Sequence, residues 1–104
     1  MNNYLAFIPG KMINNIHEDI ILITAKDMIE AKQVSMLYAR LQDNGMIYNE
    51  NGIYVEKISN ITSDDYFYTI ENMREIYEKS GKEFILPEIE ENEDDEDGEK
   101  DSWK

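Results

Sequence analysis

Residues that commonly carry out catalysis are few in this chain. Its 104 residues include one histidine, His17, and no cysteine, so zinc or copper would find neither a thiolate ligand nor a second imidazole. The sequence has no Gly-x-Ser-x-Gly turn to hold a nucleophilic serine, and its five isolated glycines form neither a phosphate loop nor a dinucleotide-binding motif. We therefore expect no enzymatic activity and no cofactor, and we expect His17 to lie in a partly exposed loop.

Carboxylates are the one abundant group that could take part in catalysis or bind a metal ion, with 23 Asp and Glu against 10 Lys and Arg. Pairs such as Asp64 and Asp65 occur where helix N-termini commonly place acids, and interaction with the helix dipole explains them. Residues 93–98 have the alternating acids and the sixth-position glycine of a calcium loop. However, the first residue is Glu93, and the twelfth is Lys104 instead of a bidentate glutamate. We therefore expect no metal site.

The negative charge divides the chain into two parts. Residues 88–104 hold ten acids and two lysines, a net charge of −8, and residues 1–87 hold 13 acids and eight bases, a net charge of −5. This pattern predicts one folded domain over residues 1–87, followed by an acidic, disordered C-terminal tail over residues 88–104. Because binding to phosphates needs clustered Lys and Arg, direct contact with nucleic acid or with an anionic membrane is disfavoured. A basic protein surface, including one that itself holds nucleic acid, is the partner that this charge favours.

The N-terminus and the apolar segments indicate the compartment. The first ten residues lack the basic start and the long apolar run of a signal peptide, and the longest strongly apolar stretch, Ile20–Ile23, is too short to span a bilayer. The lack of cysteine gives no sign of an oxidising compartment. We expect a cytoplasmic protein without membrane segments.

Two apolar runs near the N-terminus predict strands. Residues 4–8 are rich in aromatic and branched side chains, and Pro9 and Gly10 are expected to end this strand in a turn. Residues 20–24 are apolar at successive positions from Ile20 to Ile23, which is typical of a central strand covered by helices on both faces; the alternative is a buried helical turn.

The clearest helical pattern covers residues 28–43, where apolar residues recur at intervals of three and four. Asp27 is the expected N-cap, and Glu30 stands where its side chain can reach back to the amide of the cap residue, as in a capping box. Asn44 and Gly45 are expected to form a left-handed C-terminal cap.

The next segment predicts a β-hairpin. Residues 46–48 and 52–58 suit strands, and the pair Asn51 and Gly52 between them accepts the positive φ of a tight turn. We expect these two strands to pair antiparallel with each other.

A second helix is expected to begin at Ser63 or a neighbour and to end at Gly81. Its apolar stripe would consist of Tyr66, Ile70, Met73 and Tyr77. Residues 66–69 also suit a strand, and in that alternative Thr69 caps a shorter helix.

A last short strand is expected at residues 83–86, with Pro87 preventing its continuation. From residue 20 onward the expected order is then strand, helix, strand, strand, helix, strand. The sequence thus predicts an α+β fold, a small sheet with two helices in the ferredoxin-like β-α-β-β-α-β order, with residues 4–8 as an extra N-terminal strand.

Exposed tyrosines beside carboxylates give rigid contact area with negative charge, a composition suited to a basic protein surface. The residues that the sequence proposes for this role in the domain are Tyr48, Glu50, Tyr54, Glu56, Asp64, Asp65, Phe67 and Tyr68. The alternative is that these aromatic residues belong to the core or its edge.

The tail supplies further candidates for partner binding. They are Glu93, Asp94, Asp95, Glu96, Asp97 and Trp103. The acids suit docking in a basic groove, and Trp103 suits an anchor of a short recognition motif. A plain solvated appendage is the third alternative, and the sequence leaves all three open.

The short, acidic, cysteine-free chain, rich in Asn, Ile, Lys, Glu and Tyr, resembles in composition the small proteins with which phages inhibit host machinery, including anti-CRISPR and DNA-mimic proteins. The resemblance implies a stoichiometric inhibitor that acts in the cytoplasm of the host cell. The leading hypothesis is therefore a non-enzymatic inhibitor that binds a basic, nucleic-acid-binding protein. The alternatives are an accessory or structural subunit that self-assembles through a sheet edge or helix face, and a small hydrolase that uses two carboxylates.

Overall fold

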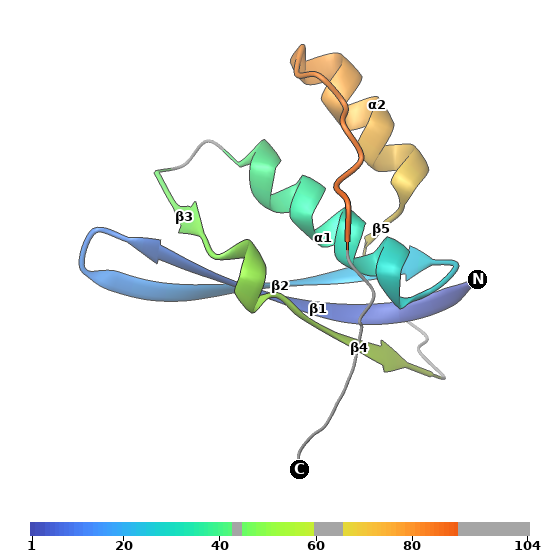
Figure 1. Ribbon diagram of the computed structural model, residues 1–104, viewed down its shortest axis with the longest axis horizontal. Helices are drawn as coiled ribbons and strands as arrows, with labels where there is room; N and C mark the ends of the chain where they lie inside the picture. The colour runs from blue at the N-terminus through green and yellow to red at the C-terminus, as the bar shows by residue number, and fades with distance from the viewer. Residues whose placement is uncertain (43–44, 60–65, 90–104) are drawn as a thin grey trace.

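The computed structural model describes residues 1–42, 45–59 and 66–89. These residues form a five-stranded sheet with two helices on one of its faces (Figure 1), so the predicted α+β class with an added N-terminal strand is confirmed. The sheet order is β3-β1-β2-β5, and β4 also pairs with β1. Several predicted residues lie outside the described parts of the chain: Asn44, Ser63, Asp64, Asp65, Glu93, Asp94, Asp95, Glu96, Asp97 and Trp103.

A long hairpin of β1 (Asn2–Met12) and β2 (Asn15–Ala25) forms the centre of the sheet. The two predicted strands are present, but Pro9 and Gly10 lie inside β1 instead of ending it. Pro9 is opposite Glu18, and its carbonyl accepts a hydrogen bond from the Asn49 amide, 2.9 Å away, on the other side of β1. A proline is tolerated there because that pair needs no N–H from residue 9.

The prediction that His17 lies in a loop is also wrong. His17 lies in β2, exposed and opposite Gly10. The chain turns four residues earlier, between Met12 and Asn15, and Ile13 in the turn has a left-handed φ of 48°. The turn of the hairpin therefore projects beyond the part of the sheet that the helices cover (Figure 1).

The expectation that helices cover residues 20–24 on both faces is wrong as well. Ile21 and Ile23 are buried under the helices, whereas Ile20 is 55% exposed. Successive side chains of a strand point to opposite faces, and both helices lie on the same face of this sheet. The sheet therefore has one covered face and one face that the described residues leave open.

Helix α1 (Met28–Leu41) begins as predicted, because the Asp27 side chain accepts a hydrogen bond of 2.8 Å from the Glu30 amide. The Glu30 carboxylate bonds the amide of Lys26, one residue before the expected cap amide, at 2.8 Å. The helix ends earlier than expected, at an extended Gln42. Gly45 has a left-handed φ of 81°, but it lies three residues beyond this cap.

The predicted hairpin at Asn51 and Gly52 is wrong. Strands β3 (Ile47–Tyr48) and β4 (Tyr54–Ile58) both pair with β1, antiparallel, and not with each other. The short helix η1 (Glu50–Gly52) lies between them, and Gly52 has no positive φ. Because β1 is 11 residues long, it offers separate stretches to both strands, which together act as one interrupted edge strand.

The alternative for the last part of the domain is confirmed. Residues Phe67–Tyr68 form strand β5, parallel to β2, and Thr69 caps helix α2 (Ile70–Ser80) in a capping box with Asn72. Gly81 ends the helix with a left-handed φ of 78°, as predicted. Tyr66 precedes the helix and is exposed, so it is not part of the buried stripe.

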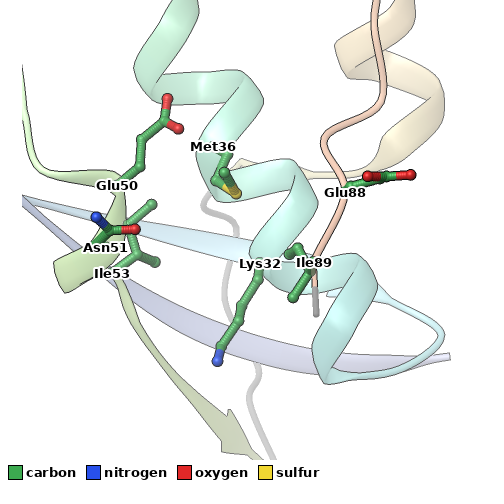
Figure 2. A pocket seen from close by; sticks show the side chains of 7 residues that line it. All are labelled: Lys32, Met36, Glu50, Asn51, Ile53, Glu88 and Ile89. Atoms are coloured by element: carbon green, nitrogen blue, oxygen red, sulfur yellow. The ribbon is translucent and has the colours of Figure 1, made fainter. Parts of the chain in front are cut away.

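Residues 82–89 form no strand, so the prediction for residues 83–86, and with it the final strand of the ferredoxin-like order, is wrong. This segment runs along the helices instead. Phe84 packs edge-on against Tyr77 at 5.6 Å, and the Gln33 side chain donates a 2.9 Å hydrogen bond to the carbonyl of the buried Pro87. Ile89 lines a cleft together with residues of α1 and η1 (Figure 2).

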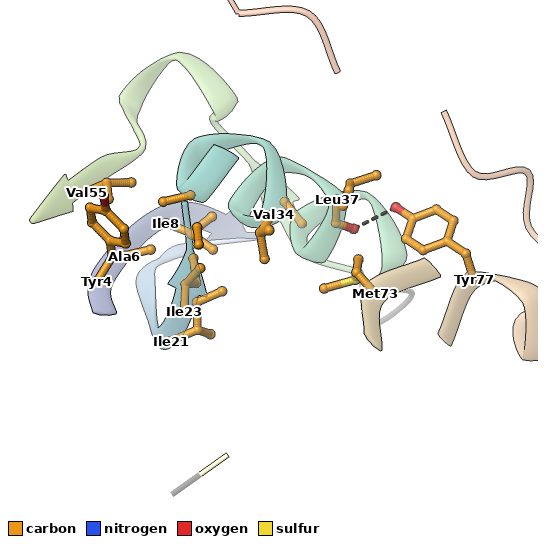
Figure 3. Packing of buried hydrophobic residues seen from close by; sticks show 13 residues of the cluster. Tyr4, Ala6, Ile8, Ile21, Ile23, Val34, Leu37, Val55, Met73 and Tyr77 are labelled. Atoms are coloured by element: carbon orange, nitrogen blue, oxygen red, sulfur yellow. Dashed lines mark hydrogen bonds between the residues drawn. The ribbon is translucent and has the colours of Figure 1, made fainter. Parts of the chain in front are cut away.

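The core lies between the covered face of the sheet and α1, with α2 closing one end (Figure 3). Its largest fully buried side chains are Ile8, Ile23, Val34, Leu37 and Met73. In the same core the Tyr77 hydroxyl donates a 2.6 Å hydrogen bond to the Leu37 carbonyl, which fastens α2 to α1.

Candidate binding surface

The face of the sheet away from the helices is an apolar surface that the described residues leave uncovered. We call it the open face. Strand alternation and the pairing register place fifteen residues on it. Its apolar members are Leu5, Phe7, Pro9, Ile16, Ile20, Leu22, Ile47, Tyr54, Ile58 and Phe67, and its polar members are Asn3, Lys11, Glu18, Thr24 and Glu56.

Exposure is concentrated in four side chains of the open face. Ile16 is 87% exposed, Ile47 76%, Tyr54 59% and Ile20 55%. The ring of Tyr54 packs at 5.9 Å against that of Phe7, which is half-buried. An apolar patch of this kind with a few polar groups is typical of a site for another macromolecule.

Two carboxylates interrupt the apolar surface. Glu18 is paired across the strands with Pro9, and Glu56 with Leu5. Both are exposed, and neither forms an ion pair within the parts of the chain that the structure describes. By the register, Phe7 lies midway between these two acids, and Lys11 lies near the end of the face close to the hairpin turn.

Three of the residues that the sequence proposed come together here. Tyr54, Glu56 and Phe67 all lie on the open face, brought there from β4 at one edge of the sheet and β5 at the other. Sequence reasoning missed Ile16 and Ile20. The signal that identifies them is the alternation along β2, which was obscured because Ile20 to Ile23 are apolar without interruption.

Three other proposed residues lie elsewhere. The Glu50 carboxylate accepts two hydrogen bonds from Arg40, of 2.8 and 2.9 Å, and so forms an ion pair within the chain. Tyr68 is half-buried on the covered side, where its ring packs edge-on against Tyr38 at 5.4 Å and against Tyr66 at 4.9 Å.

The third, Tyr48, belongs to a polar cluster beneath α1. Its hydroxyl and that of Tyr38 both donate to one carboxylate oxygen of Asp19, at 2.8 and 3.1 Å. Burial, and next the charge of Asp19, raise the pKa of Tyr38, so this hydroxyl stays a proton donor at neutral pH. The cluster therefore fastens β3 and α1 to β2.

A cleft of about 480 Å³ lies between α1, η1 and the segment that ends at Ile89 (Figure 2). Its lining residues are Lys32, Met36, Glu50, Asn51, Ile53, Glu88 and Ile89. Glu50 is bound to Arg40, and the side chain of Glu88 points away from the cleft, so no pair of carboxylates converges here. The described residues also contain no group of three or more His, Asp or Glu side chains that could hold a metal ion.

Charge is distributed unevenly between the described residues and the rest. Residues 1–42, 45–59 and 66–89 carry eleven acids and eight bases, whereas the remaining 23 residues carry twelve acids and two bases. The open face, with Glu18 and Glu56 against Lys11, thus carries a net charge of −1 on a body that is only modestly acidic.

Comparison with protein-family models, with curated proteins and with solved structures finds no match for this chain. Among the described residues, no helix has the length and apolar character needed to cross a membrane.

Proposed function

We propose that this chain is a non-enzymatic binding protein that docks through its open face on a basic protein and thereby inhibits it. The observation that carries the proposal is the open face itself, an apolar and aromatic surface that contains two carboxylates with no ion pair among the described residues. The residues at its centre are Phe7, Tyr54 and Ile20, with Glu18 and Glu56 on either side.

The dimensions of the open face suit a protein interface. Alternate residues of β1 from Asn3 to Lys11 span about 27 Å, and the three strand positions that accompany most of this length are about 14 Å wide. With the two residues of β5 the flat area is roughly 400 Å², and protruding side chains increase it toward the roughly 800 Å² that each partner contributes to a standard interface. Phe7 and Tyr54 at its centre are residue types that commonly anchor such interfaces.

The charge favours a basic partner. Glu18 and Glu56 would each meet a lysine or arginine of the partner, and the net charge of −13 would attract a basic surface at a distance. A surface evolved to hold nucleic acid has this basic character, so occupation of such a surface is the form of inhibition that we propose.

Self-assembly through the same face is the second candidate, since an apolar sheet face also suits a second copy of the chain. Two copies would, however, bring together two chains of charge −13 and place Glu18 and Glu56 of both in one interface. Light scattering after size exclusion separates the candidates: we expect a monomer of 12.3 kDa, and a stable homo-oligomer would favour self-assembly.

Retention of basic proteins from a bacterial lysate tests the proposal when two matched variants are compared with the wild type. Tyr54→Ser removes a ring that is 59% exposed on the open face, and Tyr66→Ser removes one that is 58% exposed away from it. We expect a basic protein that binds the wild type and Tyr66→Ser, is lost with Tyr54→Ser, and is released as salt rises. Equal binding to both variants, an acidic partner, or indifference to salt would refute the proposal.

A further inference from the structure

One edge of the sheet is largely unpaired. Strand β5 pairs with β2 only at Leu22 and Ile23. From Asn15 to Ile21, β2 has β1 on one side, and no strand from the described residues lies on its other side. Within the described parts of the chain this stretch of β2 is an unpaired strand edge, the kind of site at which another strand can add.

The register identifies which backbone groups face outward. The pair Met12 and Asn15 closes a two-residue turn, so these two residues exchange hydrogen bonds across the hairpin. Hydrogen-bonded and non-hydrogen-bonded pairs then alternate along the hairpin, and the pairs that contain Ile16, Glu18 and Ile20 are non-hydrogen-bonded. The N–H and C=O groups of these three residues therefore point away from β1.

Two independent contacts agree with this assignment. Pro9, the partner of Glu18, has no N–H to give, and its carbonyl faces β3 and β4, where it accepts from Asn49 at 2.9 Å. Leu22, the next residue in the outward-facing series, is where β5 begins to pair with β2.

The side chains of these same three residues lie on the open face. Ile16 is 87% and Ile20 55% exposed, and Glu18 between them has no ion pair among the described residues. Unpaired backbone groups, apolar side chains and a carboxylate therefore lie together along one edge.

We propose that an extended segment of the partner adds to β2 as a sixth strand, with an apolar, a basic and an apolar residue at alternate positions beside Ile16, Glu18 and Ile20. This inference rests on the proposed function and specifies how the partner docks. The backbone would supply affinity, and the alternate side chains would supply specificity.

Charge argues against two other occupants of this edge. In a twofold pairing of two copies that uses all three residues, Glu18 would lie directly opposite the Glu18 of the second copy, which is destabilising. Residues 90–104 of this chain hold nine acids and two lysines, so they would bring further negative charge to Glu18.

A synthetic peptide of about nine residues, with valine, lysine and valine at alternate positions and threonine between them, serves as the probe. We expect binding that slows hydrogen exchange at the amides of Ile16, Glu18 and Ile20. Methylation of the peptide nitrogens that face β2 should abolish binding, whereas methylation of the opposite set should leave it intact. This comparison leaves the protein unchanged, so it does not depend on the folding of a variant.

A charge swap tests the side-chain part of the inference. Glu18→Lys should weaken binding of the lysine peptide about fivefold to tenfold, and a peptide with glutamate in place of lysine should restore it. The control Glu75→Lys changes an exposed acid of α2 and should leave binding unaltered. Failure of the glutamate peptide to rescue would overturn the pairing with Glu18.

The outcomes separate strand addition from the proposed function. In one outcome the peptide binds and Tyr54→Ser weakens this binding, but neither set of methyl groups changes it and the amides of the three residues stay unprotected from hydrogen exchange. Strand addition is then refuted, and docking on the open face stands. If the peptide does not bind at all, strand addition is refuted, and the comparison of Tyr54→Ser with Tyr66→Ser in the lysate decides the proposed function independently.

Discussion

Replacing Ile13 by glycine should stabilise the protein. Ile13 has a φ of 48° in the two-residue turn of the β1–β2 hairpin, a left-handed conformation that a β-branched residue adopts only under strain. Turns with positive φ at their first central position are dominated by glycine at that position. The side chain is 85% exposed, so little packing depends on it.

The expected gain is a small difference between three contributions. Relief of backbone strain contributes about 2 kcal/mol. The additional conformational freedom of glycine in the unfolded chain opposes this with about 0.7 kcal/mol, and loss of the small buried part of the isoleucine with about 0.4 kcal/mol. The net stabilisation is about 1 kcal/mol, which in a domain of this size corresponds to a rise in Tm of about 5 °C.

Thermal unfolding followed by circular dichroism, with urea unfolding as a second measure, tests this expectation. Ile13→Val is the matched control, because valine keeps the branch at Cβ and should give no gain. A glycine variant no more stable than the wild type would refute the inference of strain, and so would a valine variant that gains as much.

Three further predictions concern contacts that hold the helices. Tyr77→Phe removes the buried 2.6 Å hydrogen bond to the Leu37 carbonyl and should lower the free energy of unfolding by about 1 kcal/mol in urea titrations; an unchanged midpoint would contradict this. Thr69→Ala removes the N-cap of α2 and should lower it by about 1 kcal/mol, whereas Thr69→Ser should retain most of the stability. Burial and the neighbouring carboxylate raise the pKa of Tyr38, so the folded state holds this proton more tightly than the unfolded state. The stability that this provides is complete below the ordinary tyrosine pKa near 10 and falls as pH rises above it. Tyr38→Phe should therefore reduce the loss of unfolding free energy at alkaline pH, and an unchanged loss would refute this.

Local signals in the sequence predicted the start of α1, and they predicted the start of α2 in the alternative that Thr69 caps a shorter helix. Asp27 and Thr69 both cap helices in the structure, and Gly81 ends α2 in the left-handed conformation that glycine tolerates. These features depend on residues within one turn of each other, so a single segment contains the information that determines them.

Strand pairing was predicted less well because it depends on distant residues. The Asn51–Gly52 pair suits a tight hairpin turn, yet β4 pairs with β1, some fifty residues earlier in the chain, and the pair lies in η1 instead. Pro9 resembles a strand end in isolation, but the register places it where its missing N–H is not needed. The preference for these partners comes from burial of a shared face, which no local pattern encodes.

The candidate surface was predicted only in part, because it also depends on residues that are distant in the sequence. Tyr54, Glu56 and Phe67 were identified from residue type, and the structure places them on one face. Residue type does not identify Ile16 and Ile20 as surface residues, since isoleucine at a strand position is expected in a core. Only the arrangement of both helices on the same side of the sheet leaves them exposed.

The central position of β1 in the sheet has a consequence for how the chain folds during its synthesis. β1 is translated before the other strands, and its partner β2 is complete at Ala25, so the hairpin can close early with local contacts alone. Its other edge, however, stays unpaired until β3 and β4 have been made, at Ile58. During that interval the nascent hairpin presents both faces and both edges, which makes this the stage at which interruption of translation would leave the chain most prone to aggregate.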